Sequence, residues 1–218
     1  MHAPVNISVN KAHFPVTVLG PGRRIGLWLQ GCSIGCKGCL SRDTWAREPG
    51  KDMAVSALLA WCEEISGGVL DGVTISGGEP FEQPAALAEL LRGLTRWRER
   101  AGLDFAILCY SGFPLATLRA RHAALLAPLD AVIAEPFVDQ RPSQHPWMGS
   151  SNQSLTPLSA RGTQRYAAPP PAAAKQMQVL VDGQRVWYVG VPARGDLAKL
   201  EALCRARGMD FAQVSWKP

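Results

Sequence analysis

Three cysteines stand close together in the stretch GCSIGCKGC, namely Cys32, Cys36 and Cys39. Grouped thiolates are typical metal ligands, and the chemistry depends on their number. A structural zinc ion normally takes four protein ligands, and a 4Fe-4S cluster normally takes four thiolates. Of the other cysteines, Cys62 and Cys109 fall on predicted core elements and are expected to pack as small apolar residues. A cluster held by three thiolates keeps one iron open, and an open position marks a place where a substrate or cofactor binds.

The stretch SGGEP is a second candidate site, in which Gly77, Gly78 and Glu79 follow a predicted buried strand at 72–76. Two glycines let the backbone at the tip of a strand approach a ligand closely. The carboxylate of Glu79 is a suitable partner for an ammonium group. A plain Gly-Gly turn with a solvated glutamate is the alternative, and it would be preferred if the three cysteines were absent.

Apolar strands alternate with amphipathic helices over much of the chain. Strands are predicted at 25–31, 72–76, 105–110 and 130–137, and helices at 53–66, 84–101 and 115–127. This alternation predicts an α/β fold, a partial (β/α) barrel with its helices outside. Such barrels carry their chemistry at the carboxyl ends of the strands. Both motifs lie at strand ends, as do Tyr110 and Ser111 of the stretch CYSGF.

The chain is expected to divide into a core at 1–162, a proline-rich linker at 163–175 and an appendage at 176–218. No periodicity is visible from 138 to 175, and the stretch AAPPPAAAK favours an extended, stiff chain. The appendage is predicted to be β-β-α-β, with a hairpin around Asp182 and Gly183, a helix at 196–207 and a last strand at 211–216. We expect this unit to recognise a macromolecule, or else to pack on an edge of the barrel and stabilise it.

The composition is that of an ordinary globular protein. Apolar residues make up 47% and charged residues 19%, and the net charge of +5 comes from scattered Lys and Arg residues. Nucleic acid is therefore not an expected partner. No apolar run reaches the roughly 18 residues of a membrane span, and the first residues lack the pattern of a signal peptide. We expect a cytoplasmic protein, in which clustered thiols indicate metal chemistry before disulfides.

Together the two motifs resemble those of the radical S-adenosylmethionine (SAM) superfamily, which has C-x3-C-x2-C after a first strand and Gly-Gly-Glu after a second. The resemblance implies that Cys32, Cys36 and Cys39 bind a 4Fe-4S cluster whose open iron is chelated by SAM. It implies that one electron from the reduced cluster cleaves SAM and releases a 5′-deoxyadenosyl radical, which abstracts hydrogen from the target. No catalytic side chain beyond the cluster and SAM is implied. SAM contacts are implied for Gly77, Gly78, Glu79, Tyr110 and Ser111.

The stretch LGPGRRIGLWLQGCSIGCKGCLSRDTW is similar to the start of anaerobic ribonucleotide reductase activating proteins. The same family carries Trp-x-Gly-Ser-Ser-Asn-Gln near its end, which WMGSSNQ at 147–153 matches. The resemblance implies a glycyl-radical activase, which takes a hydrogen from the backbone Cα of one glycine in a partner enzyme. It also implies an electron donor such as flavodoxin or ferredoxin.

Two other readings stay open. The same radical chemistry could modify another protein, a peptide or a small molecule. The chain could also be a non-catalytic iron-sulfur or zinc-binding module, although this leaves the open iron position and the stretch SGGE unexplained. The simplest activating proteins end soon after the Gly-Ser-Ser-Asn-Gln stretch, whereas this chain continues to residue 218. The target is therefore the least determined feature.

Overall fold

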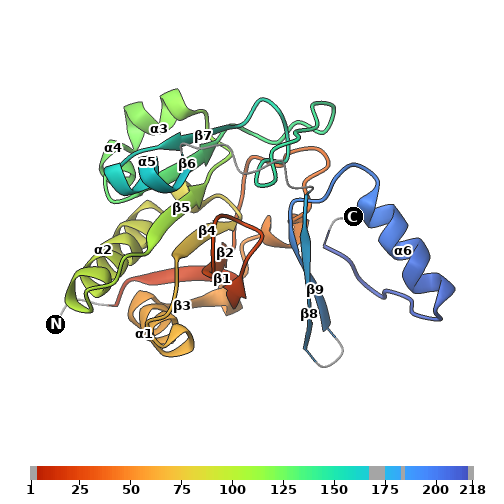
Figure 1. Cartoon of the computed structure of the whole chain (residues 1–218), viewed down its shortest axis with the longest axis horizontal. Coiled ribbons are helices and arrows are strands. Elements are labelled where there is room, and N and C mark those ends of the chain that lie inside the picture. Colours follow the sequence, from red (N-terminus) through yellow and green to blue (C-terminus); the bar gives the residue numbers. More distant parts are fainter. Residues whose placement is uncertain (1–3, 167–174, 183–184, 216–218) are drawn as a thin grey trace.

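A mixed sheet of seven strands forms the centre of the computed structural model, which describes residues 4–166, 175–182 and 185–215 (Figure 1). Its strands are β1 (Asn6–Val16), β2 (Arg24–Leu29), β3 (Asp52–Ala54), β4 (Gly72–Gly77), β5 (Ala106–Tyr110), β6 (Ala131–Ala134) and β7 (Ser154–Pro157). They lie in the order β3-β1-β2-β4-β5-β6-β7. The strands β2, β4, β5 and β6 are parallel, while β1, β3 and β7 add antiparallel edges. The carboxyl ends of four neighbouring strands therefore meet at one edge of an open sheet.

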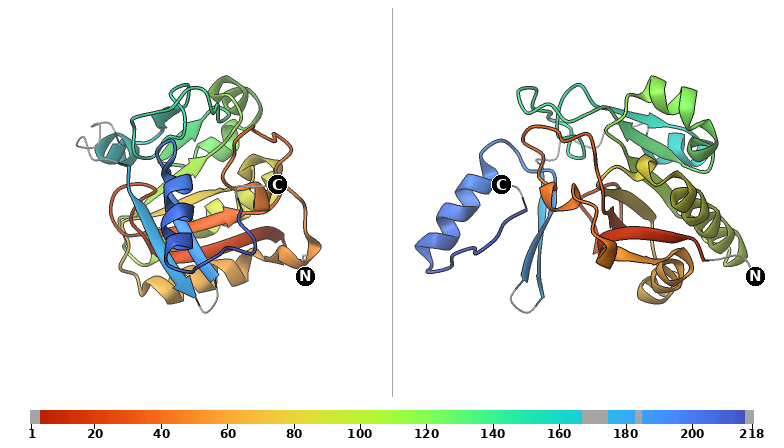
Figure 2. Two further views of the ribbon diagram at one scale, coloured as in Figure 1. Left: turned by 90° about the vertical axis from the view of Figure 1, so that its right-hand side faces the viewer. Right: turned by 180° about the vertical axis from the view of Figure 1, so that it is seen from behind.

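Helices cover both faces of the sheet (Figures 1 and 2). The main core lies between the sheet and the helices α1 (Val55–Ser66), α2 (Pro84–Arg100), α3 (Leu115–Arg121) and α4 (Ala123–Leu126). On the opposite face, α5 (Ala160–Tyr166) packs on the sheet through Tyr166. None of the helices in the described part of the chain has the length and apolar character needed to cross a lipid bilayer.

The central strands are buried on both faces, which explains why they read as continuous apolar runs. In β5, Ile107 and Cys109 point into the main core, whereas Ala106 and Leu108 point to the opposite layer. The predicted α/β class with a parallel centre is therefore confirmed.

Several elements differ from the sequence-based expectation. Strands β1 and β7 carry polar residues or proline and lack an apolar run, so the pattern does not predict them. The single helix predicted at 115–127 is interrupted at His122 and forms α3 and α4. Helix α5 lies within the stretch that shows no periodicity, and it crosses the expected domain boundary at residue 162. The first part of the expected linker is thus helical, while residues 167–174 lie outside the described residues.

Arg24 is the second arginine of the Gly-Pro-Gly-Arg-Arg stretch and the first residue of β2, and it is completely buried. Its guanidinium donates to Thr74 Oγ1 at 2.6 Å and to the carbonyl oxygens of Val73 and Ala106 at 2.9 and 3.0 Å. A Cβ at Gly72 would lie only 2.0 Å from this guanidinium. Arg24 therefore joins β2, β4 and β5 at the end of the sheet that is opposite the cysteine loop.

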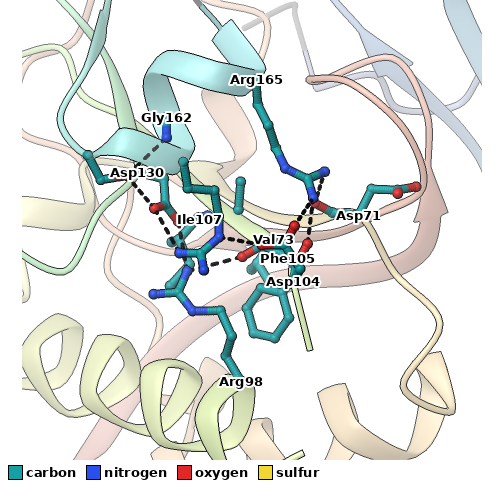
Figure 3. A network of polar contacts seen from close by, with 12 residues as sticks. Asp71, Val73, Arg98, Asp104, Phe105, Ile107, Asp130, Gly162 and Arg165 are labelled. Carbon is teal, nitrogen blue, oxygen red and sulfur yellow. Dashed lines mark hydrogen bonds and ion pairs between the residues drawn. The ribbon is translucent and has the colours of Figure 1, made fainter. Parts of the chain in front are cut away.

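Asp130 lies at the centre of a second polar network at that end of the sheet (Figure 3). Its buried carboxylate accepts hydrogen bonds from Arg98 at 2.8 Å, from the Ile107 N–H at 2.8 Å and from Ser159 Oγ at 2.6 Å. Arg161 approaches its other oxygen at 3.4 Å. The network fixes α5 and the end of α2 to the sheet.

We expect Asp130→Ala to destabilise the fold by about 3–5 kcal/mol, because it leaves the mostly buried Arg98 without its carboxylate. The matched control is Asp104→Ala, which removes ion pairs to Arg161 and Arg165 from a carboxylate that is 69% exposed. That change is expected to cost about 0–1 kcal/mol, since water screens exposed pairs. Urea unfolding of the three proteins measures both values. Equal losses for the two variants would contradict the central role of Asp130.

The C-terminal unit consists of the hairpin β8 (Met177–Asp182) and β9 (Arg185–Gly190), followed by α6 (Asp196–Ala206). The hairpin is confirmed. The last strand expected at 211–216 is not formed over its described residues, which run as an irregular tail to Ser215. The appendage is therefore a hairpin and a helix and not β-β-α-β. Within the described residues, the tail does not pair with any strand.

This unit is packed on the core. The Gln178 side chain accepts from the Thr17 N–H at 3.1 Å and donates to the Pro15 carbonyl at 2.8 Å. Val189 is buried in a small apolar cluster with Val16 and Trp28. Of the two roles expected for the appendage, packing on the barrel is thus present in the structure, and recognition stays a prediction.

Candidate functional site

The loop that carries the three cysteines leaves the carboxyl end of β2. The N–H groups of Gly31 and Cys32 donate to the Thr44 and Trp45 carbonyls at 2.7 and 3.0 Å, which brings the far end of the loop back to its start. Within the loop, the Cys39 N–H donates to the Cys36 carbonyl at 3.1 Å. All three thiols are free and half-buried, so this short loop presents them together at the edge of the sheet.

Two contacts from distant parts of the chain hold the cysteine loop. The Glu82 carboxylate accepts from Ser33 Oγ at 2.5 Å and from the Ser33 N–H at 3.1 Å, next to the first cysteine. At the other end, Ser215 Oγ donates to the Leu40 carbonyl at 3.0 Å, and the Arg42 N–H donates to the Ser215 carbonyl at 3.0 Å. The loop is thus fixed directly after its first cysteine and directly after its third.

The glycine pair at the tip of β4 lies directly against the start of this loop. The Gly78 N–H donates to Leu29 O and the Glu79 N–H donates to Gly31 O, both at 2.8 Å. A Cβ at Gly78 would lie 2.2 Å from the Gly31 carbonyl oxygen, and Gly77 has a φ of 96°. Only glycine fits these two positions. The two sequence motifs therefore form one continuous surface.

The Glu79 side chain is buried, with 1% of its surface exposed, and it links the ends of β4 and β5. Its carboxylate accepts from Ser111 Oγ at 2.9 Å, from the Gly112 N–H at 2.7 Å and from the Phe81 N–H at 3.1 Å. Burial raises the pKa of Glu79 to about 7, although the hydrogen bonds from these donors oppose the increase. A contact between this carboxylate and an ammonium group stays a prediction, while its role in joining two strand ends is observed.

The pKa of Glu79 predicts how the stability of the cluster-free protein depends on pH. A pKa raised from 4.5 to about 7 in the folded state means that ionisation opposes folding. The contribution of Glu79 to stability is therefore fully present below about pH 4.5 and is lost as the pH rises through about 7, a change of roughly 3 kcal/mol. Glu79→Gln cannot ionise, so the difference in unfolding free energy between the two proteins should change across this pH window. Parallel stability curves in urea would contradict the raised pKa.

The two other predicted SAM contacts on β5 both have partners within the protein. Ser111 belongs to the Glu79 link and also accepts from the Phe113 N–H at 3.0 Å. Tyr110 donates its hydroxyl to the Trp147 carbonyl at 2.8 Å, and burial raises its pKa. Tyr110 therefore ties the strand end to the Trp-x-Gly-Ser-Ser-Asn-Gln stretch. A direct contact of either residue with SAM stays a prediction.

The Trp-x-Gly-Ser-Ser-Asn-Gln stretch supports the cysteine loop through the segment that follows β6. The amide groups of Asn152 and Gln153 donate to the Pro136 and Glu135 carbonyls at 2.8 and 3.2 Å. Directly after Glu135 and Pro136, the backbone N–H of Phe137 donates to the Cys36 sulfur. Burial raises the pKa of the Cys36 thiol, and this hydrogen bond opposes part of the increase. A motif far away in the sequence thereby orders the backbone around a thiol.

The donors around the thiols fit a metal-bound thiolate. The N–H groups of Ile34 and Gly35 donate to the Cys32 sulfur, where burial raises the pKa of the thiol and these bonds oppose the increase. N–H groups aimed at sulfur stabilise the deprotonated form, which is the form that binds iron. In the part of the chain that the structure describes, no three His, Cys, Asp or Glu side chains are gathered around the position of a single metal ion. A cluster does not need that arrangement, because its iron atoms hold the thiolates apart.

Ser33 and Glu82 have no signal in the sequence, because they are an ordinary polar pair until the fold brings them into contact. Asp139 follows a predicted strand, so two positions are expected for it, facing the site or capping a turn. It lies against the cysteine loop, since a Cβ at Gly38 would be 3.2 Å from the Asp139 Cβ. Gly112 contributes only its backbone N–H. Backbone donors and contacts between distant loops are invisible to residue-type patterns.

Comparison with known proteins identifies the family. Residues 18–156 match the model of the 4Fe-4S single cluster domain. The chain belongs to this family, and its class is that of the radical SAM activating enzymes, which use a 4Fe-4S cluster and SAM. The matched segment contains both motifs and the sheet, whereas the C-terminal unit lies outside it.

The relatives carry the names of activating enzymes. The anaerobic ribonucleoside-triphosphate reductase-activating protein of Vibrio cholerae is 30% identical over 151 residues, covering 66% of this chain and 94% of that protein. The protein of the same name from Enterobacteria phage T4 is 26% identical over 138 residues, covering 63% and 86%. The pyruvate formate-lyase-activating enzyme of Staphylococcus epidermidis is 37% identical over 105 residues, covering 45% and 41%. Among solved structures, QueE from Escherichia coli overlaps with a TM-score of 0.37 and 21% identity over 49% of this chain and 53% of that one.

Proposed function

We propose that this protein installs a glycyl radical in a partner enzyme, with an anaerobic ribonucleoside-triphosphate reductase as the first candidate. The observation that carries the proposal is the contact between the cysteine loop and the Gly77-Gly78 tip at one edge of the sheet. The names of the relatives supply the candidate partner. A flavodoxin or ferredoxin is the proposed source of the electron.

In this proposal, Cys32, Cys36 and Cys39 are the three protein ligands of the cluster. When bound, the cluster and SAM supply a 5′-deoxyadenosyl radical through one-electron cleavage of the sulfonium, with methionine as the other product. The glycine tip offers its backbone to SAM at close range, because no side chain intervenes. Glu79 and Ser111 keep the ends of β4 and β5 in register beneath it.

A cleft of about 1910 Å³ supports a macromolecular target. One wall carries Cys39, Gly77 and Tyr110, and the opposite wall belongs to the C-terminal unit, including Trp187 and Val189. Sites for small molecules usually measure about 300–1,000 Å³. The cleft therefore has room for a polypeptide segment in addition to SAM.

The test uses anaerobically purified protein with its cluster, SAM, reduced flavodoxin and the anaerobic reductase of the same organism. We expect 5′-deoxyadenosine, methionine and the electron paramagnetic resonance (EPR) doublet of a glycyl radical on the reductase. If SAM were cleaved but no radical formed on the reductase, the radical chemistry would stand and the target would be another protein, a peptide or a small molecule. Absence of SAM cleavage with a reducible cluster would overturn the proposal.

A further inference from the structure

The short turn that follows the glycine tip connects the two halves of the site. This turn, η3 (Pro80–Glu82), is buried at Pro80 and Phe81 and directs Glu82 back toward the cysteine loop. The next residue, Gln83, donates to the Gln30 carbonyl at 3.1 Å and exchanges hydrogen bonds with the backbone of Ser8. The turn is therefore fastened to the end of β2 and is not free to move independently of it.

Glu82 contacts the residue that directly follows the first cysteine. Both carboxylate oxygens lie 3.1 Å from the Ser33 N–H, and one of them accepts from Ser33 Oγ at 2.5 Å. Ser33 directly follows Cys32, so this bidentate contact fixes the first turn of the cysteine loop. Two other carboxylates lie at this edge: that of Glu79 accepts hydrogen bonds from Ser111 and Gly112 at the end of β5, and Asp139 lies against Gly38 of the loop.

We propose that Glu82 is a positioning residue that clamps the cysteine loop through Ser33 and, by its negative charge, lowers the reduction potential of the cluster. The proposal rests on the cluster site proposed above. A fixed anion beside Cys32 disfavours the addition of an electron, and net charge near a cluster is one of the factors that set its potential. Glu82 thereby makes the reduced cluster a stronger reductant while it holds the loop in place.

The two effects of Glu82 are separable by substitution. Glu82→Ala removes both the clamp and the charge. Glu82→Gln removes the charge and one acceptor oxygen, and it keeps one carbonyl oxygen that can accept from Ser33 Oγ and N–H. The matched control is Glu89→Gln. Glu89 is a half-buried glutamate on α2, and its carboxylate pairs with Arg92 and Arg96 of the same helix.

The readouts are the rate at which a chelator removes the cluster and the reduction potential, measured by EPR during anaerobic redox titration. We expect about tenfold faster cluster loss in Glu82→Ala and a rate within about twofold of the wild type in Glu82→Gln. At a fixed potential, the ratio of reduced to oxidised cluster should rise about threefold in Glu82→Gln, a shift of roughly 28 mV at 59 mV per tenfold change. The shift should shrink at high ionic strength, because salt screens a half-exposed charge.

Each result decides one part of the proposal. A wild-type potential in Glu82→Gln would overturn the electrostatic role. Unchanged cluster loss in Glu82→Ala would overturn the clamp. An equal shift of the reduction potential in Glu89→Gln would mean that the net charge of the protein, and not the position of Glu82 beside Cys32, sets the potential. Failure of the wild-type protein to bind any cluster would instead overturn the proposed function.

Discussion

Alanine in place of Cys32, Cys36 or Cys39 is expected to reduce cluster binding and SAM cleavage to background. A site of three thiolates already leaves one iron open, so a variant with two leaves a second iron without a protein ligand. The loop cannot supply a substitute, because no histidine or further cysteine lies within it. Iron and sulfide analysis of anaerobically purified variants, together with chromatography of the SAM products, measures both losses.

The other three cysteines provide the controls. Cys62 and Cys109 are completely buried in the main core, and Cys204 lies on α6. Changing any one of them to alanine should leave iron and sulfide at the wild-type level, with at most a loss of stability from the missing sulfur. Loss of the cluster in Cys204→Ala with a folded protein would overturn the assignment of ligands.

The parallel centre of the sheet could be predicted from the sequence because burial on both faces produces long apolar runs. The edge strands of the sheet could not be predicted in this way. In β1, the stretch NISVNKAHFPV mixes polar and apolar residues because its consecutive residues 10–15 are only half-buried. The tail shows the opposite error, since the stretch at 211–216 resembles a strand but its described residues, 211–215, form no strand pairing. Pairing depends on an available neighbour, which composition does not reveal.

The site divides in the same way. The cysteines and the glycine pair could be predicted as site residues because the chemistry proposed for them requires those residue types at that spacing. The role of Glu79 was only partly accessible: a carboxylate beside a Gly-Gly tip predicts an ammonium partner, which stays a prediction, but it does not predict the hydrogen bonds from Ser111 Oγ and the Gly112 N–H. Backbone donors carry no residue type that could be recognised. The clamps on the cysteine loop also depend on contacts between segments that only the fold brings together.

Removal of the tail after residue 208 is expected to make the cluster about tenfold easier to extract. Ser215 holds the far end of the cysteine loop with two hydrogen bonds, one to Leu40 and one to Arg42. Each bond contributes about 0.5–1.5 kcal/mol, and about 1.4 kcal/mol corresponds to a factor of ten. The sheet and the hairpin keep their packing in this shortened chain, because Val189 and Gln178 precede the cut. The loop is therefore expected to loosen while the fold stays intact.

Two single substitutions locate the effect. Ser215→Ala removes only the bond from Oγ to the Leu40 carbonyl, so its rate of cluster loss to a chelator should lie between those of the full chain and the shortened one. Lys199→Ala changes an exposed residue of α6 and should leave the rate unchanged. If the shortened chain released its cluster at the wild-type rate, the tail would have no role in the site. The C-terminal unit would then act only as the far wall of the cleft, where it is available to a partner but not linked to the cluster.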